Sequence, residues 1–395
     1  MSKVRQSIAV TAFNLAALPQ RAAASLVVIV GITGVVAVLI SVFALSTGFR
    51  RTIESATRPD RVIVLSSGSE SESGSGMSRA AVDSIMLRAA VRRDAAGKPV
   101  ASAEAVIPAR VAKKSDGTDA YISLRGIGPR GLAVHREIRL ISGRLFRPAV
   151  NELIVGRNAK QLFANLELGD YVDLRGGRWQ VVGEFSSGGS GHESGLIADA
   201  DTVLAAYNSK MFNSVVLELA DSSRFDELRN TLRSDPTLEA EVLRESEYAA
   251  QLAKPWRRIL DWLAYSVGSI MAAGALCAAL NTMYSAVSAR RGEIATLRAL
   301  GFGAFPVVVS VLVEALLLAS IGAGLGCLIA YGLFNGNAIS TLGGTVLGTQ
   351  VVYRLMVTPD LMLAGVATAL ALGLLGGLLP ALQAARANVV EALRA

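Results

Sequence analysis

The chain has two histidines, His135 and His192. Histidine is a common ligand of zinc and a common group for proton transfer. The His192-Glu193 pair is not followed by a second histidine, so the HExxH zinc motif is absent. We therefore expect no second metal ligand within reach of His192, no bound metal and no zinc catalysis. A GxSxG nucleophile elbow is also absent, and the sequence predicts a protein that is not an enzyme.

Glycine and serine are concentrated in residues 188–195 (GGSGHESG). Backbone amides of such a segment can cradle a phosphate group. Glycine and serine clusters, however, more often form loops. We favour a mobile loop that connects Phe185 to a strand beginning at Leu196, with phosphate binding as the alternative.

A nucleotide-binding P-loop is missing. Walker A needs two glycines at a fixed spacing, followed by lysine and then serine or threonine. The only Gly-Lys pair is Gly97-Lys98, where Pro99 follows and Arg92 stands in place of the first glycine. If this protein uses ATP, another chain hydrolyses it.

The two cysteines, Cys277 and Cys327, both lie inside apolar runs. They cannot form a disulfide framework in a water-exposed domain, and a cysteine metal site is not expected. We interpret both as small apolar side chains.

Four long apolar runs dominate the composition, which is 52% hydrophobic and only 18% charged. The runs cover residues 22–48, 263–289, 299–334 and 361–385, and Glu314 is the one charge within the third. About 20 apolar residues cross the hydrocarbon core as a helix, so each run predicts a membrane span. The net charge of +7 agrees with basic residues flanking such spans and gives little support to nucleic-acid binding.

Basic residues next to the spans predict the orientation. Those expected on one side are Lys3, Arg5, Arg21, Arg290, Arg291, Arg298, Arg386 and Arg394. The positive-inside rule places that side, and hence both termini, in the cytoplasm. The long segment between the first two spans then lies outside the cytoplasm.

That segment, residues 49–258, reads as an α+β domain. Short strands are predicted at 61–65, 121–124, 152–155, 171–174, 179–185, 215–219 and 240–243. Residues 175–178 (RGGR) predict a hairpin turn, because Gly176 and Gly177 tolerate positive φ. The order of the elements suggests two lobes, one built from the ends of the segment and one from its middle. A helix over 245–258 would form a stalk leading to the second span.

Residues 288–302 (SARRGEIATLRALGF) predict a short amphipathic helix between the second and third spans. One face would carry Ile294, Leu297, Leu300 and Gly301, at spacings of three and four. Two interpretations stay equally open from the residues alone: a helix that docks into a groove of a partner, or a charged turn between two spans.

The stretch RRGEIATLRALGF and the following 307–326 closely resemble the permease domain of the FtsX/MacB/LolC-like family, the membrane subunits of type VII ABC transporters. The last residues, 378–395, resemble the closing pattern of that family through Pro380, Arg386 and the Glu-Ala-Leu-Arg tail, although Val389 and Val390 replace more usual residues. Residues 141–163 and 169–185 resemble its periplasmic core domain.

The resemblance implies a partner and a mechanism. A separate ABC ATPase dimer would bind ATP and Mg on the cytoplasmic face, so that no cofactor is expected in this chain. ATP-driven closure of the ATPases would then move the extracytoplasmic domains, a process called mechanotransmission. The residues implied in coupling to the ATPase are Arg291, Glu293, Ile294, Leu297, Arg298, Leu300 and Gly301. The family also implies a second permease copy, most simply a homodimer in the inner membrane.

The expected organisation is an α-helical membrane protein with four transmembrane helices and an α+β extracytoplasmic domain inserted between the first two. Its segments are 1–48 (N-terminal cytoplasmic segment and first span), 49–258 (MacB-like core domain with stalk), 259–289 (second span), 290–305 (coupling helix), 306–334 (third span), 335–360 (short periplasmic loop), 361–385 (fourth span) and 386–395 (cytoplasmic tail).

Several functions remain open. Export with a periplasmic adaptor and an outer-membrane channel, as in MacB-type relatives, is preferred over lipoprotein extraction or regulation of a cell-wall hydrolase. For Glu314, a structural role is favoured over proton transport, although a carboxylate within a span is a functional candidate.

Overall fold

The computed structural model describes residues 6, 8, 10–12, 22–55, 57–299, 303–340 and 351–386. The chain divides into two compact units. The helical unit comprises Met1–Thr47, Ile259–Asn337 and Leu355–Ala395, and the sheet unit comprises Gly48–Arg258 and Ala338–Arg354. The sheet unit thus includes a second stretch of chain, within the region predicted to be a short loop over 335–360.

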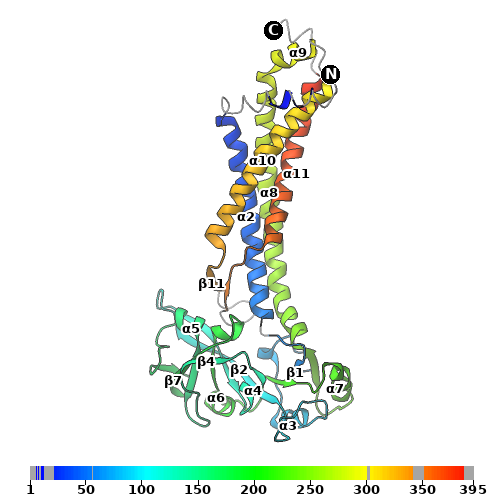
Figure 1. The fold of residues 1–395 in the computed structure, drawn as a ribbon. Helices are drawn as coiled ribbons and strands as arrows, with labels where there is room; N and C mark the ends of the chain where they lie inside the picture. Colours follow the sequence, from blue (N-terminus) through cyan, green and yellow to red (C-terminus); the bar gives the residue numbers. More distant parts are fainter. Residues whose placement is uncertain are drawn as a thin grey trace. The chain divides into compact units, whose positions relative to one another are not determined.

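Four long helices carry the apolar runs (Figure 1). They are α2 (Ala22–Glu54), α8 (Glu245–Ala289), α10 (Ala304–Phe334) and α11 (Pro359–Arg386). Each contains a segment long and apolar enough to cross a membrane. The four predicted spans are therefore confirmed, and the predicted stalk over 245–258 and the second span are parts of one helix, α8.

Close packing in the helical unit depends on glycine. A Cβ added to Gly326 of α10 would lie 2.8 Å from Cβ of Val36 in α2, closer than carbon atoms pack. Gly373 of α11 would similarly lie 2.6 Å from Cβ of Ala319 in α10. A Cβ on Gly324 would meet no atom within 4 Å. In α10, therefore, Gly326 lies where the helix packs closely on α2, whereas Gly324 does not take part in this contact.

The sheet unit is built on one mixed ten-stranded sheet. Its strands are β1 (Arg61–Ser66), β2 (Ala101–Ala112), β3 (Asp119–Ile127), β4 (Arg139–Gly143), β5 (Glu152–Gly156), β6 (Tyr171–Leu174), β7 (Gly177–Ser186), β8 (Leu196–Asp199), β9 (Ser214–Glu218) and β10 (Ala240–Arg244). The strand order is β10-β1-β9-β2-β3-β8-β5-β7-β4, with β6 paired to β7. The pairs β3/β8 and β5/β7 are parallel and the others are antiparallel.

Strands from the two ends of the domain lie together at one edge of this sheet, and strands from its middle lie at the other edge. Both groups belong to one continuous sheet rather than to two separate sheets. The predicted hairpin is present as β6–β7, where Leu174 pairs with Gly177 and Gly176 adopts φ 85°. Strands β2 and β4 were not predicted.

Short helices complete the sheet unit. These are α3 (Arg79–Met86), α4 (Gly131–Val134), α5 (Arg157–Leu162), α6 (Ala200–Ala206), α7 (Phe225–Arg233) and the 3-10 turns η2 (Glu72–Gly74), η3 (Gly191–Ser194) and η4 (Ser222–Arg224). The largest fully buried apolar side chains between sheet and helices include Trp179, Phe163 and Leu124.

A two-stranded ribbon, β11 (Ala338–Ser340) and β12 (Val352–Arg354), belongs to the same unit. The amide of Val352 donates to the hydroxyl of Ser194 at 2.9 Å. The ring of Tyr353 packs edge-on against Phe49, with centroids 5.4 Å apart. The region between the third and fourth spans therefore contributes to the sheet unit.

Candidate functional site

A short helix, α9 (Arg291–Ala299), follows the second span. Ile294 and Ala295 are buried, and Ile294 packs with Val287 of α8 and Val307 of α10. Among the α9 residues whose side chains are described, the exposed ones are Gly292, Glu293, Thr296 and Ala299. The helix is thus anchored on one side and presents the other to its surroundings.

Among the predicted coupling residues whose side chains are described, only Ile294 points away from the expected docking face. Ile294 points into its own helical unit, so its side chain holds α9 in place and is not displayed. Glu293 is exposed and Arg298 is partly exposed. For Arg291 and Leu297 only the backbone is described, and Leu300 and Gly301 lie outside the described residues.

The residue before α9 forms an ion pair inside the helical unit. Arg290 lies 3.2 Å (Nη1 to Oε2) from Glu314 of α10, and both residues are buried. A buried charge persists only when it is paired and hydrogen-bonded. This contact supports the structural role favoured for Glu314, because it fixes the start of α9 to the third span.

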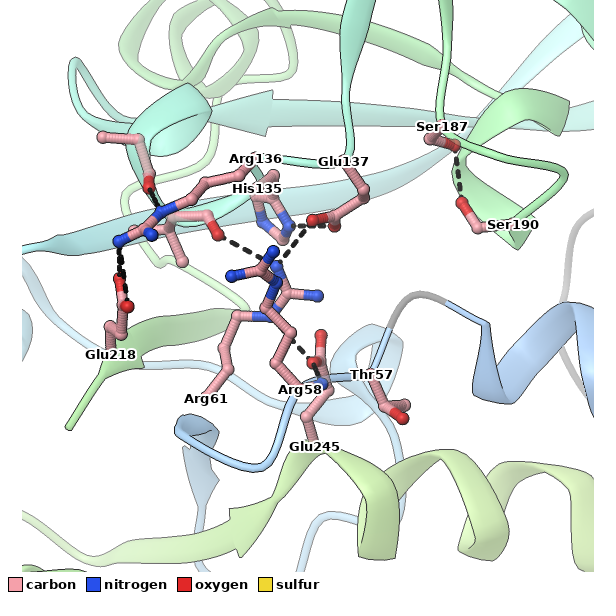
Figure 2. A network of polar contacts seen from close by, with 12 residues as sticks. Thr57, Arg58, Arg61, His135, Arg136, Glu137, Ser187, Ser190, Glu218 and Glu245 are labelled. Atoms are coloured by element: carbon pink, nitrogen blue, oxygen red, sulfur yellow. Dashed lines mark hydrogen bonds and ion pairs between the residues drawn. The ribbon is translucent and has the colours of Figure 1, made fainter. Parts of the chain in front are cut away.

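In the sheet unit, a second group of buried charges centres on Arg61 of β1 (Figure 2). Its Nε donates to Oε2 of Glu245 at 2.7 Å, and its Nη1 donates to Oε2 of Glu137 at 3.0 Å. Nη1 also donates to the backbone oxygen of Val134 at 2.9 Å. Burial raises the pKa of Glu245 more than the charge of Arg61 lowers it.

His135 connects this group to β2. Its Nε2 lies 2.7 Å from Oε1 of Glu104, and its Nδ1 lies 3.3 Å from Oε1 of Glu137. Burial lowers the pKa of His135, but the charge of Glu104 and the hydrogen bonds that the ring donates to both carboxylates raise it to about 9 overall. His135 in this arrangement is a cation between two carboxylates, whose own pKa values are held well below the usual range.

Arg125 of β3 extends the network. It donates to both oxygens of Glu72, at 2.9 and 2.7 Å, and also to Glu104. Glu72 in addition accepts from the hydroxyl of Ser214 at 2.6 Å. Every one of these carboxylates is thus held by a charged or hydroxyl donor, as buried charges require.

A cavity of about 190 Å³ lies beside the network. Its lining includes apolar side chains such as Ile63 and Leu252, together with His135, His192 and Arg125. The two histidine rings are 5.2 Å apart. Burial, and then the charges of Arg125 and His135, lower the pKa of His192 to about 3, so this ring is neutral.

The expectation that no second ligand lies within reach of His192 is therefore wrong. One donor atom each from His135, Glu137 and His192 lies within 4.8 Å of the others. Sequence motifs could not reveal this group, because the two histidines are 57 positions apart in the chain and only the pairing of β3 with β8 brings their segments together. A motif with fixed spacing detects ligands that lie close together in the sequence, such as those on one helix. It does not detect ligands that come from two separate segments.

The glycine-rich segment connects β7 to a strand that begins at Leu196, as predicted. Glu193 is buried, and its Oε1 accepts from the amides of Ser187 and Gly189 at 2.6 and 3.0 Å. It accepts a third hydrogen bond from the hydroxyl of Ser186 at 2.7 Å. The carboxylate of Glu193 therefore already binds two backbone amides at the start of this loop, which argues against a phosphate at these amides.

Four apolar helices and a mixed-sheet domain inserted after the first define a multi-pass membrane protein with a periplasmic or extracellular domain. A model of the MacB-like periplasmic core domain matches residues 25–235, more than half of the chain, and a model of the FtsX-like permease C-terminal region matches 265–389. The chain belongs to the MacB/FtsX-like family of ABC transporter permeases. Neither matched region is an ATPase domain.

Individual relatives are more distant. The cell division protein FtsX of Mycobacterium tuberculosis, from strains H37Ra, CDC 1551 and H37Rv, is 29% identical over 162 residues, which are 39% of this chain and 53% of the relative. The chain thus spans about half the length of these curated relatives.

Among solved structures, the periplasmic region of MacB from Actinobacillus actinomycetemcomitans matches at 14% identity and a TM-score of 0.38, over 49% of this chain and 92% of that one. The extracellular domain of the transporter YknZ from Gram-positive bacteria matches at 15% and 0.35, over 46% and 99%.

Proposed function

We propose that this chain is the membrane subunit of an ABC transporter and couples ATP hydrolysis by a separate ATPase dimer to movement of its extracytoplasmic domain. In this proposal α9 is the element on which the ATPase docks. The termini and α9 face the cytoplasm, as the basic residues beside the spans favour.

The observation that carries this proposal is the way in which α9 packs against the long helices. Ile294 is buried among residues of three long helices, and Arg290, directly before α9, is paired with Glu314 inside the unit. A push on the exposed side of α9 is therefore transmitted to α8 and α10 rather than absorbed by a loose connection. Packed cores respond to such pushes by discrete rearrangement, because they are dense and resist compression.

We further propose that the complex contains two copies of this chain and exports a substrate with a periplasmic adaptor and an outer-membrane channel. The extent of the match to the MacB-like core domain supports export. The name of the matched mycobacterial relatives supports a second candidate, regulation of a cell-wall hydrolase by the same movement. Lipoprotein extraction is a third outcome of the same mechanism.

The docking proposal is tested by co-purification of the ATPase with the full chain in detergent. Glu293→Arg reverses a charge on the exposed side of α9, and Leu297→Asp places a carboxylate on the same helix. We expect each to reduce ATPase recovery at least tenfold. Asp360→Arg is the matched control, because it makes a like charge reversal at an exposed residue at the opposite end of the helical unit.

Full recovery of the ATPase with both α9 variants would reject α9 as the docking element. Cross-linking from exposed positions of the sheet unit then separates the finer candidates. Capture of an adaptor supports export, capture of a hydrolase supports the second candidate, and capture of a lipoprotein supports the third.

A further inference from the structure

The residues His135, Glu137 and His192 converge from two segments of the sheet unit. His135 and Glu137 follow α4, and His192 lies in the turn η3. One donor atom from each lies within 4.8 Å of the other two. The 3.3 Å separation of His135 Nδ1 and Glu137 Oε1 equals the edge of a tetrahedron whose centre is about 2.0–2.1 Å from each ligand, the bond length of zinc to nitrogen and oxygen.

Neighbouring side chains orient the first two of these residues. Glu104 lies 2.7 Å from Nε2 of His135 and accepts its N–H, which directs Nδ1 toward Glu137. Carboxylates commonly hold metal-binding histidines in this way. Arg61 donates to Oε2 of Glu137 and leaves Oε1 facing His135.

His192 is oriented by packing alone. Its ring lies edge-on against the ring of His135, and the ring nitrogens make no hydrogen bond within the described part of the chain. A neutral imidazole has a free lone pair, which is the form that binds metal. The adjoining cavity of about 190 Å³ has room for the ion and a bound water.

The charge of the surroundings matches a divalent ion. The network holds four carboxyl groups, those of Glu72, Glu104, Glu137 and Glu245, and two guanidinium groups, those of Arg61 and Arg125. The carboxylates therefore outnumber the guanidinium groups by two, and a divalent cation would balance this excess of negative charge.

We propose that His135, Glu137 and His192 form a binding site for a divalent transition-metal ion, with zinc as the best match. Two imidazoles and one carboxylate are a common zinc ligand set that leaves a fourth position open. Here the fourth position faces the cavity and holds water. The ion ties the segment after α4 to η3, whose Ser194 hydroxyl in turn accepts from Val352 of the β11–β12 ribbon. This proposal does not depend on the ATPase partner.

The test uses the full chain in detergent, stripped of metal with a chelator and titrated with Zn²⁺ by calorimetry. We expect one Zn²⁺ per chain and an increase in the thermal unfolding temperature on binding. His192→Ala and Glu137→Gln should each weaken binding at least tenfold. Glu152→Gln is the matched control, because Glu152 is also a buried carboxylate held by arginine but lies outside the cluster. The affinity of this control variant for Zn²⁺ should equal that of the unmodified chain.

Two results would overturn the proposal: no saturable Zn²⁺ binding by the unmodified chain, or the same affinity in His192→Ala as in the unmodified chain. A variant that fails to fold does not block the test, because X-ray absorption of the Zn²⁺-loaded unmodified protein reports the ligands directly. Scattering from two imidazoles supports the site, and a spectrum without imidazole scattering rejects it.

Discussion

The guanidinium group of Arg290 and the carboxylate of Glu314 form a buried ion pair, with Nη1–Oε2 and Nη2–Oε1 distances of 3.2 and 3.4 Å. Arg290 stands between the second span and α9, and Glu314 lies in the third span. The pair therefore connects α9, the element proposed to dock the ATPase, to a membrane helix through two charges that cannot reach water without unpacking the helices.

Removing one member of this pair should lower the free energy of unfolding more than removing both members. Glu314→Ala leaves a buried arginine without its partner and should destabilise the helical unit by about 3–5 kcal/mol. Replacing both residues with methionine avoids the unpaired charge and should be considerably less damaging. Chemical unfolding of the detergent-solubilised chain measures the loss of stability in the single variant and in the double variant. Equal losses in the single and double variants would show that the pair does not act as a unit.

The glycines of α10 provide a second prediction. Gly326→Leu places a side chain against Val36 of α2, where even a Cβ would lie only 2.8 Å away, and should sharply reduce the yield of folded protein and its unfolding temperature. Gly324→Leu, two positions away and facing open space, should change neither. Similar losses from the two variants would contradict the packing of α10 on α2.

Glu152 should make the sheet unit sensitive to acid. Its hydrogen bonds from Arg144, followed by those from Arg147, lower its pKa from 4.5 to about 2. A carboxyl group whose folded-state pKa is lowered stabilises the fold above its unfolded-state pKa, and this stabilisation is lost as the pH falls from about 4.5 through about 2. Because the side chains of the two arginines are 49% and 67% exposed, we expect only about 1–3 kcal/mol at neutral pH.

The matching measurement compares the unfolding free energy of the unmodified chain and Glu152→Gln at pH 7 and pH 3. The difference between them should shrink by more than half at pH 3, because the unmodified residue is then largely protonated in the unfolded state. A difference that is constant with pH would mean that Glu152 contributes through shape alone.

The loop at Glu193 provides a fourth prediction. Glu193→Ala removes the acceptor for two backbone amides and one hydroxyl and should destabilise the sheet unit by about 2–4 kcal/mol, since each buried donor left unpaired costs about 1–3 kcal/mol. Glu193→Gln keeps one acceptor oxygen and should lose less. Thermal unfolding distinguishes these outcomes, and a neutral Glu193→Ala would indicate that water replaces the carboxylate.

Apolar runs and turn chemistry were enough to predict the four spans, the inserted α+β domain and the β6–β7 hairpin, because these are local properties of the chain. Strand β2 was missed because Pro108 and alternating small residues hide its pattern. The buried network was missed for a different reason. Glu104, His135 and His192 come from separate segments, and only the sheet order brings them together. The inward direction of Ile294 likewise depends on how α9 packs, which its amphipathic pattern alone does not determine.

The ribbon of β11 and β12 has a consequence for how the extracytoplasmic domain is made and handled. Because the sheet unit takes residues from both Gly48–Arg258 and Ala338–Arg354, the ribosome must finish the third span before the last piece of this domain exists. A recombinant fragment cut at the first and second spans would lack that piece and leave the Ser194 hydroxyl and the Phe49 ring uncovered. Chimeras that exchange this domain between relatives should therefore transplant both stretches together.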